Sequence, residues 1–299
     1  MLHRSTTLTV RALLIAAILS MQFSASAQPL RDSIRNILNA QKGEFAVAFR
    51  DVQTGETILI NEHTGFHAAS TTKTPVMIEL YKQAAAGKFA LTDQVTVKNE
   101  FRSIVDSSVY QLNAADDSQQ ELYKQVGTKK TIYELMYEMI IQSSNLATNM
   151  LIELVGGKQV IATMRELGAS DIQVLRGVED SKAFAQGLNN TVTAYDLMLL
   201  FDQIAKGKVV SNAACEGMIR ILLDQKFNDI IPAKLPPGTK VAHKTGFITA
   251  LHHDSGIVFL PDGRKYVLVL LSRKLEDEKA AVDAMASVSA MIYHYETGE

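Results

Sequence analysis

Hydrophobic residues follow different periods in three parts of the chain. Near the start, one helical face is apolar over residues 30–41, and alternating patterns then predict strands around 45–49 and 58–60. From about residue 70 to about residue 230, apolar residues recur every three or four positions, which predicts a series of helices. The last part returns to short alternating runs, which predict three strands within residues 240–272 before a closing helix.

This order predicts an α+β fold in which both ends of the chain contribute strands to one antiparallel sheet. Terminal helices flank the sheet, and an all-helical domain is inserted between the two groups of strands. We place the sheet domain at residues 28–61 and 225–299 and the helical domain at 62–224. A cleft is expected where the two domains meet. The polar stretch at 113–130 interrupts the helical pattern and indicates a surface insertion.

Residues 1–27 have the layout of a secretory signal peptide. Arg4 and Arg11 precede a short apolar run, and Ala25 and Ala27 then form an A-x-A cleavage site. The apolar run is too short for a stable membrane anchor. We therefore expect an exported protein, periplasmic or secreted, without a membrane anchor.

Charge and cysteine content narrow the range of partners and cofactors. The formal net charge of −2 gives no sign of binding to nucleic acid or to an anionic membrane. The single cysteine, Cys215, excludes an intrachain disulfide. His63 with His67, and the run at 252–254, have metal-like spacing but lack a third ligand at a recognisable interval. We expect no metal, no cofactor and a monomer.

Ser70 and Lys73 are the first candidates for chemistry. They are three positions apart at the start of a predicted helix, so the lysine amine can reach the serine hydroxyl. A serine hydroxyl needs such a base before it becomes an effective nucleophile. The alternative is that Ser70 caps the helix and Lys73 is a solvated surface charge.

Two further groups of polar residues interrupt apolar patterns. Ser143 and Asn145 lie where a helical run calls for core residues, and Lys244 lies in a strand that otherwise indicates core, followed by Thr245 and Gly246. Buried polar side chains require partners, so the alternative for the first pair is a simple hydrogen-bonded pair. A buried lysine is costly unless it is paired or faces a cleft, and the glycine permits close approach to the strand.

Together these motifs resemble the signature of the penicillin-recognising serine hydrolases, and of class A serine β-lactamases in particular. In chain order the motifs are Ser70 with Lys73, Ser143 with Asn145, and Lys244-Thr245-Gly246. The resemblance covers essentially the whole chain after the leader, and the family's fold agrees with the predicted one. It implies hydrolysis of a small-molecule β-lactam through a covalent acyl-serine ester.

The resemblance also implies a role for each residue. Ser70 would attack the carbonyl, Lys73 would relay its proton, and Ser143 would pass a proton to the leaving nitrogen. Asn145 would hold the substrate's side-chain amide. Lys244 and Thr245 would bind the substrate carboxylate, and Gly246 would belong to the same substrate-binding strand. The oxyanion hole would be formed by the backbone N–H groups of Ser70 and Phe247.

Release of the ester separates a β-lactamase from its relatives. The family uses a loop glutamate, and Glu179 follows Asn145 at nearly the usual interval, so it is the candidate general base. Two departures favour slow release: Ala183 stands where the family has a water-holding asparagine, and Ser144 where it has aspartate. Asn189 or Asn190 could replace the asparagine. A D-alanyl-D-alanine carboxypeptidase or esterase, or a non-turnover penicillin-binding sensor, stays as the alternative.

Overall fold

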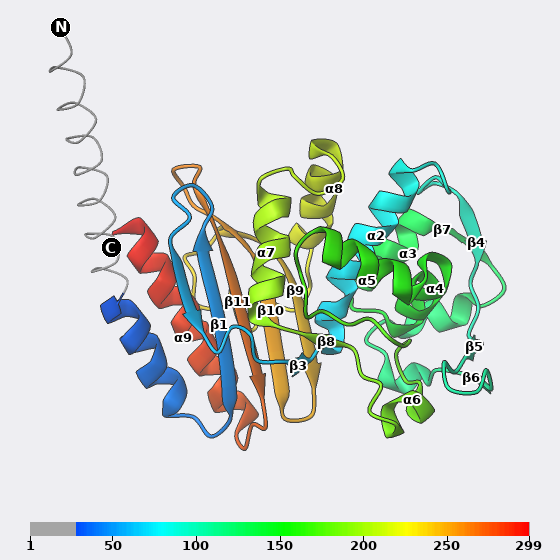
Figure 1. Cartoon of the computed structure of the whole chain (residues 1–299), viewed down its shortest axis with the longest axis horizontal. Coiled ribbons are helices and arrows are strands. Elements are labelled where there is room, and N and C mark those ends of the chain that lie inside the picture. Colours follow the sequence, from blue (N-terminus) through cyan, green and yellow to red (C-terminus); the bar gives the residue numbers. More distant parts are fainter. Residues whose placement is uncertain (1–27, 299) are drawn as a thin grey trace, which may run out of the picture.

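The computed structural model describes residues 28–298, so the predicted signal peptide lies outside the described residues. Its centre is an antiparallel five-stranded sheet in the order β2-β1-β11-β10-β9. The strands are β1 (Glu44–Asp51), β2 (Thr57–Ile60), β9 (Lys240–Ile248), β10 (Leu251–Phe259) and β11 (Lys265–Arg273). Strands from both ends of the chain therefore form one sheet, which confirms the predicted fold class (Figure 1).

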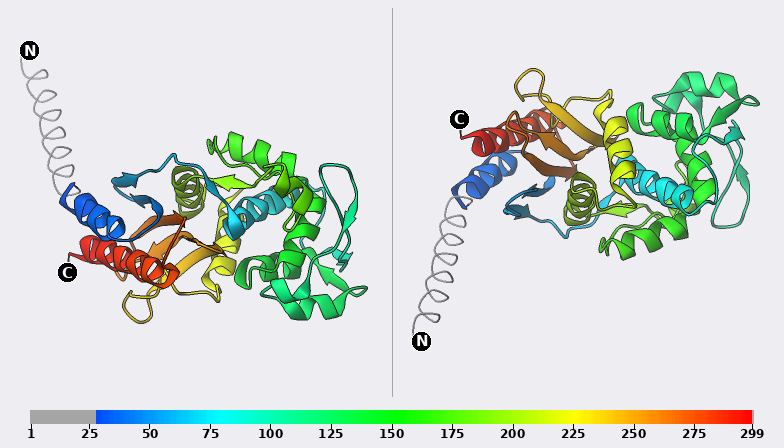
Figure 2. Two further views of the ribbon diagram at one scale, coloured as in Figure 1. Left: turned by 90° about the horizontal axis from the view of Figure 1, so that it is seen from below. Right: turned by 90° about the horizontal axis from the view of Figure 1, so that it is seen from above.

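Both faces of the sheet are buried, and alternate residues of each central strand enter different cores. Leu268 and Leu270 of β11 face the terminal helices, which are residues 28–39 and α9 (Glu278–Thr297). Val267 and Val269 face the other way and join the larger core. Figure 2 shows the two terminal helices side by side against the sheet. Because a strand buried on both faces needs apolar residues throughout, β11 is a continuous apolar run.

The helical part surrounds α2 (Lys73–Ala85), nine of whose thirteen residues are buried. The other helices are α3 (Ile132–Ile141), α4 (Asn145–Val155), α5 (Gly157–Glu166), α6 (Ser181–Ala185), α7 (Ala194–Ala205) and α8 (Asn212–Leu223), with 3₁₀ turns η1 (Ala69–Thr72), η2 (Ala114–Asp116) and η3 (Gln120–Gln125). Helices α3, α4, α5 and α8 all contact α2. The start of α2 lies beside β9, at the edge of the sheet, because η1 packs on that strand.

Residues 62–224 also contain short strands. They form three two-stranded sheets: β3 (Phe66–His67) with β8 (Thr191–Val192), β4 (Gln94–Thr96) with β7 (Lys129–Thr131), and β5 (Phe101–Arg102) with β6 (Val109–Tyr110). Helix α7 packs on β1, β10 and β11 rather than on the other helices alone. The domain boundaries at residues 61 and 225 stay a prediction.

The polar stretch at 113–130 is more than a surface insertion. Leu122, in η3, is fully buried in the larger core, and Asp117 is also buried. The segment therefore packs against the helices that follow it. Across the described part of the chain, no helix combines the length and apolar character needed to cross a bilayer.

Candidate active site

A cleft of about 850 Å³ opens beside η1, the start of α4 and the end of β9. Its walls include five of the residues predicted from sequence, Ser70, Ser143, Asn145, Glu179 and Phe247. Lys73 and Lys244 are fully buried behind those walls. The cleft therefore collects residues that lie far apart in the sequence.

Ser70 lies in η1, the 3₁₀ turn that leads into α2. Lys73 is the first residue of α2, and its Nζ lies 2.9 Å from Ser70 Oγ. Neither η1 nor α2 has a side-chain cap hydrogen bond at its N-terminus. Ser70 therefore does not serve as a helix cap, and its hydroxyl faces the lysine amine.

The Lys73 amine is surrounded by acceptors. Besides Ser70 it lies 2.6 Å from the Ser143 carbonyl oxygen, 3.0 Å from Ser143 Oγ and 3.1 Å from Asn145 Oδ1. Burial lowers the pKa of Lys73 to about 7, while the negative charge of Asp117 acts in the opposite direction. A substantial share of the amine is therefore neutral at neutral pH and can accept a proton.

Ser143 Oγ is shared between two buried lysines. Lys244 Nζ lies 3.2 Å from this hydroxyl and 2.8 Å from the carbonyl oxygen of Thr245. Burial, and then the positive charge of Lys73, hold the pKa of Lys244 well below its ordinary value, although Asp254 opposes them. Ser143 itself has a φ of +58°, which is uncommon for a residue with a side chain. The turn thus aims its hydroxyl at both amines.

Gly246 lets β9 approach the backbone of Ser70 and Thr71 closely. A Cβ placed on Gly246 would lie 3.0 Å from Ser70 N and 3.1 Å from Thr71 N. We expected the glycine to admit a ligand; the close approach seen here is that of the strand to η1. Phe247 follows on the rim of the cleft with 56% of its surface exposed. Thr245 and Gly246 line a neighbouring pocket of about 500 Å³ that shares Phe247 with the cleft.

Glu179 lies on the opposite side of the cleft in a loop. Its Oε1 accepts a long hydrogen bond of 3.5 Å from Asn145 Nδ2, and its Oε2 accepts one of 3.4 Å from Asn113 N. Burial raises the pKa of Glu179 above that of an ordinary glutamate. Its φ of +63° is again unusual. No hydrogen bond joins its carboxylate to Ser70 or Lys73 in the described structure.

The loop around Glu179 is held through its backbone. Asn149 Oδ1 accepts from Val178 N at 2.6 Å, and Asn149 Nδ2 donates to Val178 O at 2.9 Å. At the base of the loop, Asn190 Oδ1 accepts from the N–H groups of Leu175 and Arg176. Sequence reasoning missed Asn149, although a buried asparagine in an apolar helix is a signal of the same kind as Ser143.

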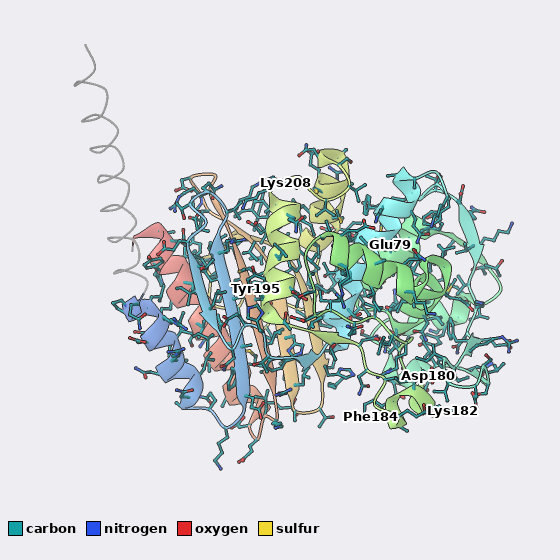
Figure 3. All side chains as sticks on the ribbon, viewed as in Figure 1. Glu79, Asp180, Lys182, Phe184, Tyr195 and Lys208 are labelled. Atoms are coloured by element: carbon teal, nitrogen blue, oxygen red, sulfur yellow. The ribbon has the colours of Figure 1, made fainter. Side chains whose placement is uncertain are left out.

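The predicted replacements for the missing asparagine are engaged elsewhere. Asn190 Nδ2 donates to Arg176 O, so both ends of its amide serve the loop base, and Asn189 Oδ1 accepts from the Arg176 guanidinium. Ala183 is fully buried. Asp180 caps α6 and accepts from Ser103 Oγ, which attaches the loop to its neighbour. Figure 3 shows Asp180 and Phe184 close together at α6.

Other charged groups named from sequence lie away from the cleft or are already bonded. Arg273, at the end of β11, donates to Glu44 Oε2 at 2.7 Å and to the Gly65 carbonyl, so its guanidinium is engaged outside the cleft. His252 pairs with Glu278 at 2.7 Å. Within residues 28–298, no group of three or more His, Cys, Asp or Glu side chains is placed to hold a metal ion.

Comparison with known proteins identifies the family. A model described as the "Beta-lactamase enzyme family" matches residues 29–295. The chain is 25% identical to the extended-spectrum beta-lactamase PER-1 of Pseudomonas aeruginosa, over 96% of this chain and 94% of that protein. The beta-lactamase structure from Sphaerobacter thermophilus DSM 20745 superposes with a TM-score of 0.76 at 25% identity, covering 90% of this chain and 97% of that one. The structure of PBP-A shares the fold, with a TM-score of 0.77 at 23% identity and coverage of 91% and 97%. Since the family model spans nearly the whole of the described structure, the chain belongs to the beta-lactamase enzyme family.

Proposed function

We propose that the protein is a serine β-lactamase that hydrolyses the β-lactam amide through an acyl-serine intermediate on Ser70. One observation carries the proposal. A fully buried lysine with a pKa of about 7 lies 2.9 Å from the Ser70 hydroxyl and 3.0 Å from the Ser143 hydroxyl. This arrangement supplies a nucleophile, its base and a second proton carrier at neutral pH.

Acylation begins with proton transfer from Ser70 Oγ to neutral Lys73 Nζ. Oγ then bonds to the β-lactam carbonyl carbon, and negative charge moves to the carbonyl oxygen. The N–H groups of Ser70 and Phe247 are the proposed donors for that oxyanion, and the close approach at Gly246 supports their pairing. As the carbon–nitrogen bond breaks, the nitrogen takes a proton from Ser143 Oγ, which is replenished from Lys73.

Deacylation requires a water molecule beside the ester. Glu179 takes one proton from this water while the water oxygen bonds to the ester carbon. The carbon–Oγ bond then breaks, a proton returns to Ser70, and the opened product leaves as an acid. Asn145 supports this step because its amide contacts both Lys73 and Glu179. Lys244 and Thr245 are the proposed carboxylate-binding residues, and the Lys244 amine lies 3.2 Å from Ser143 Oγ.

The hydrogen bonds around Glu179 support a second candidate function, that of a peptidase, an esterase or a penicillin-binding sensor. The Glu179 carboxylate makes only long hydrogen bonds, and Asn189 and Asn190 are both bonded to Arg176. Slow ester release would leave the protein acylated for long periods. The two functions share acylation and differ only in the second step.

Turnover of a chromogenic cephalosporin separates the two functions. We expect many turnovers per enzyme, with Ser70→Ala inactive and unlabelled by penicillin in mass spectrometry. Ser118→Ala is the matched control, because Ser118 lies on the wall of the same cleft but donates to Gln142 O. A single burst of product equal to the enzyme concentration, followed by a stable adduct on Ser70, would contradict the β-lactamase and favour the peptidase, esterase or penicillin-binding sensor.

We also propose that the protein is exported, periplasmic or secreted, and acts as a monomer on small-molecule substrates. The layout of residues 1–27 supports export, and the net charge of −2 gives no support for a nucleic-acid partner. Fractionation of cells that express the full chain tests the location. Light scattering of the purified protein tests the oligomeric state.

A further inference from the structure

Asp117 is a buried carboxylate that the proposed chemistry does not use. It lies between η2 and η3, in the polar segment 113–130, and only 3% of its surface is exposed. Its hydrogen-bond donors are backbone N–H groups and hydroxyls. A buried charge held in this way needs several good donors, because water no longer solvates it.

The donors converge from the start of α4. Asp117 Oδ2 accepts from Asn145 N at 2.8 Å and from Leu146 N at 2.9 Å. The same oxygen accepts from Tyr123 OH at 2.9 Å, and Oδ1 accepts from Gln119 N, also at 2.9 Å. The carboxylate therefore joins the polar segment to the turn that carries Ser143 and Asn145.

This turn needs an acceptor from outside itself. The first N–H groups of a helix have no partner within the helix, and negative charge is favoured beside them. Ser144 caps α4, but its hydroxyl accepts only from Ala147 N, at 3.2 Å. Asp117 supplies the acceptor for the N–H groups of Asn145 and Leu146, and hydrogen bonds to a charged acceptor are stronger than neutral ones.

The turn that Asp117 contacts also surrounds the amine of Lys73, the proposed base. Ser143 O, Ser143 Oγ and Asn145 Oδ1 all lie within 3.1 Å of Lys73 Nζ. A rotation of the turn would move these three atoms together. The φ of +58° at Ser143 adds strain that the surrounding contacts must hold in place.

We propose that Asp117 is a positioning residue, whose carboxylate holds the Ser143–Asn145 turn in the geometry that acylation of Ser70 requires. It acts from a separate segment and touches neither nucleophile nor substrate. The inference rests on the proposed function, because it concerns the acylation step shared by a β-lactamase and its alternatives.

The first test compares two aspartates that both accept bonds from a helix start. Asp117→Asn removes the charge and keeps the size, and we expect labelling by a fluorescent penicillin to slow about 100-fold. Asp277→Asn is the matched control, since Asp277 accepts from Ala280 N at the start of α9 and forms no hydrogen bond with the Ser143–Asn145 turn in the described structure. Its labelling rate should equal the parent's even if its Tm falls.

The second test moves the carboxylate. Ser144 Oγ lies 3.5 Å from Asp117 Oδ2, so Ser144→Asp alone places two carboxylates together and should slow labelling. The double variant Asp117→Asn with Ser144→Asp again has one carboxylate there, and should regain a rate within about fivefold of the parent. A general loss of packing would give no such rescue.

The outcomes separate this inference from the proposed function. The positioning role would be overturned if penicillin labelled the Asp117→Asn protein at the parent's rate. It would also be overturned if the double variant were labelled no faster than Asp117→Asn alone. The Tm values of the parent, the two single variants and the double variant form a double-mutant cycle. This cycle reports whether Asp117 holds the turn even if penicillin labels none of the four proteins. A parent protein that penicillin does not label therefore contradicts the proposed function. If positions 117 and 144 show no coupling in either Tm or labelling rate, this inference is contradicted instead.

Discussion

The two sides of the cleft are built in different ways. On one side, Ser70, Lys73, Ser143 and Lys244 come from the starts of two helices and from a strand, and their hydrogen bonds measure 2.6–3.2 Å. On the other side, Glu179 is half-buried in a loop, and its carboxylate bonds measure 3.4 and 3.5 Å. The side proposed to form the ester is tightly bonded, whereas the side proposed to release it leaves its carboxylate with only long hydrogen bonds.

The difference follows from what each step requires. Proton transfer from Ser70 to Lys73 is between protein groups, so both can be fixed in advance. In the proposed mechanism Glu179 must instead bond to a water molecule, and unused lone pairs on its carboxylate make that bond available. The loop is fixed at Val178 and at its base rather than at Glu179 itself. We expect acylation and deacylation to respond to different substitutions.

The largest expected effect tests the tightly bonded side. Lys73→Met keeps a long apolar chain in a buried site but removes the base, and we expect acylation to slow about 10³-fold. Lys82→Met is the control, because Lys82 lies on the same helix and is paired with Glu166 on the surface. Stopped-flow measurement of penicillin labelling gives the rate. A Lys73→Met protein within tenfold of the parent would remove the lysine from its role.

The next effect tests the loop side. Glu179→Gln keeps the shape and removes the base for water, so ester release should slow about 10²-fold while acylation stays near the parent's rate. Mass spectrometry should then show an accumulating adduct of substrate mass. Glu278→Gln, on the rim of the same cleft, is the control. Equal steady-state hydrolysis by Glu179→Gln and the parent would contradict the proposed division of roles.

The pH dependence should separate the two sides in one protein. Lys73 is active as a base only when neutral, and its pKa is about 7, so acylation should fall about tenfold per pH unit below that value. As the proposed base for water, Glu179 must be ionised, so ester release should fall as the pH drops through its pKa, which burial raises above the ordinary glutamate value. Burst and steady-state rates between pH 5 and 9 give both profiles. Acylation that stays constant from pH 6 to pH 8 would refute the lysine base.

The smallest effect concerns the strand beside the nucleophile. In Gly246→Ala the new methyl group meets Ser70 N at 3.0 Å and Thr71 N at 3.1 Å, and backbone atoms yield little. We expect about tenfold slower acylation, because the strand and η1 must separate. Gly65→Ala is the control, since nothing lies within 4 Å of its new Cβ. Unchanged labelling and Tm in Gly246→Ala would show that the close approach is not required.

The fold was largely predictable because its patterns are local. The strands β9, β10 and β11 lie within a few residues of the predicted runs, since each is a run of β-forming residues bounded by turns. The family was also predicted from the motifs and is confirmed by the family match. Periodicity could not tell which surface a helix covers, so it did not predict that α7 lies on the sheet.

The site was predictable where spacing along one element determines contact. Ser70 and Lys73 meet because they are one turn apart. Residue spacing does not predict contacts between segments that lie far apart in the sequence, such as Asp117 with the start of α4 or Asn149 with Val178. It also could not show that Thr245 lines the neighbouring pocket. The roles assigned to these residues stay predictions until the variants are measured.

The contact between Asp117 and the start of α4 also has an evolutionary meaning. One carboxylate beside this helix is useful and two repel each other, so positions 117 and 144 constrain one another. An acid gained at position 144 would be harmful until the acid at 117 was lost, and the reverse order would pass through an equally poor intermediate. Among descendants of this chain, the two positions should therefore exchange charge together or not at all.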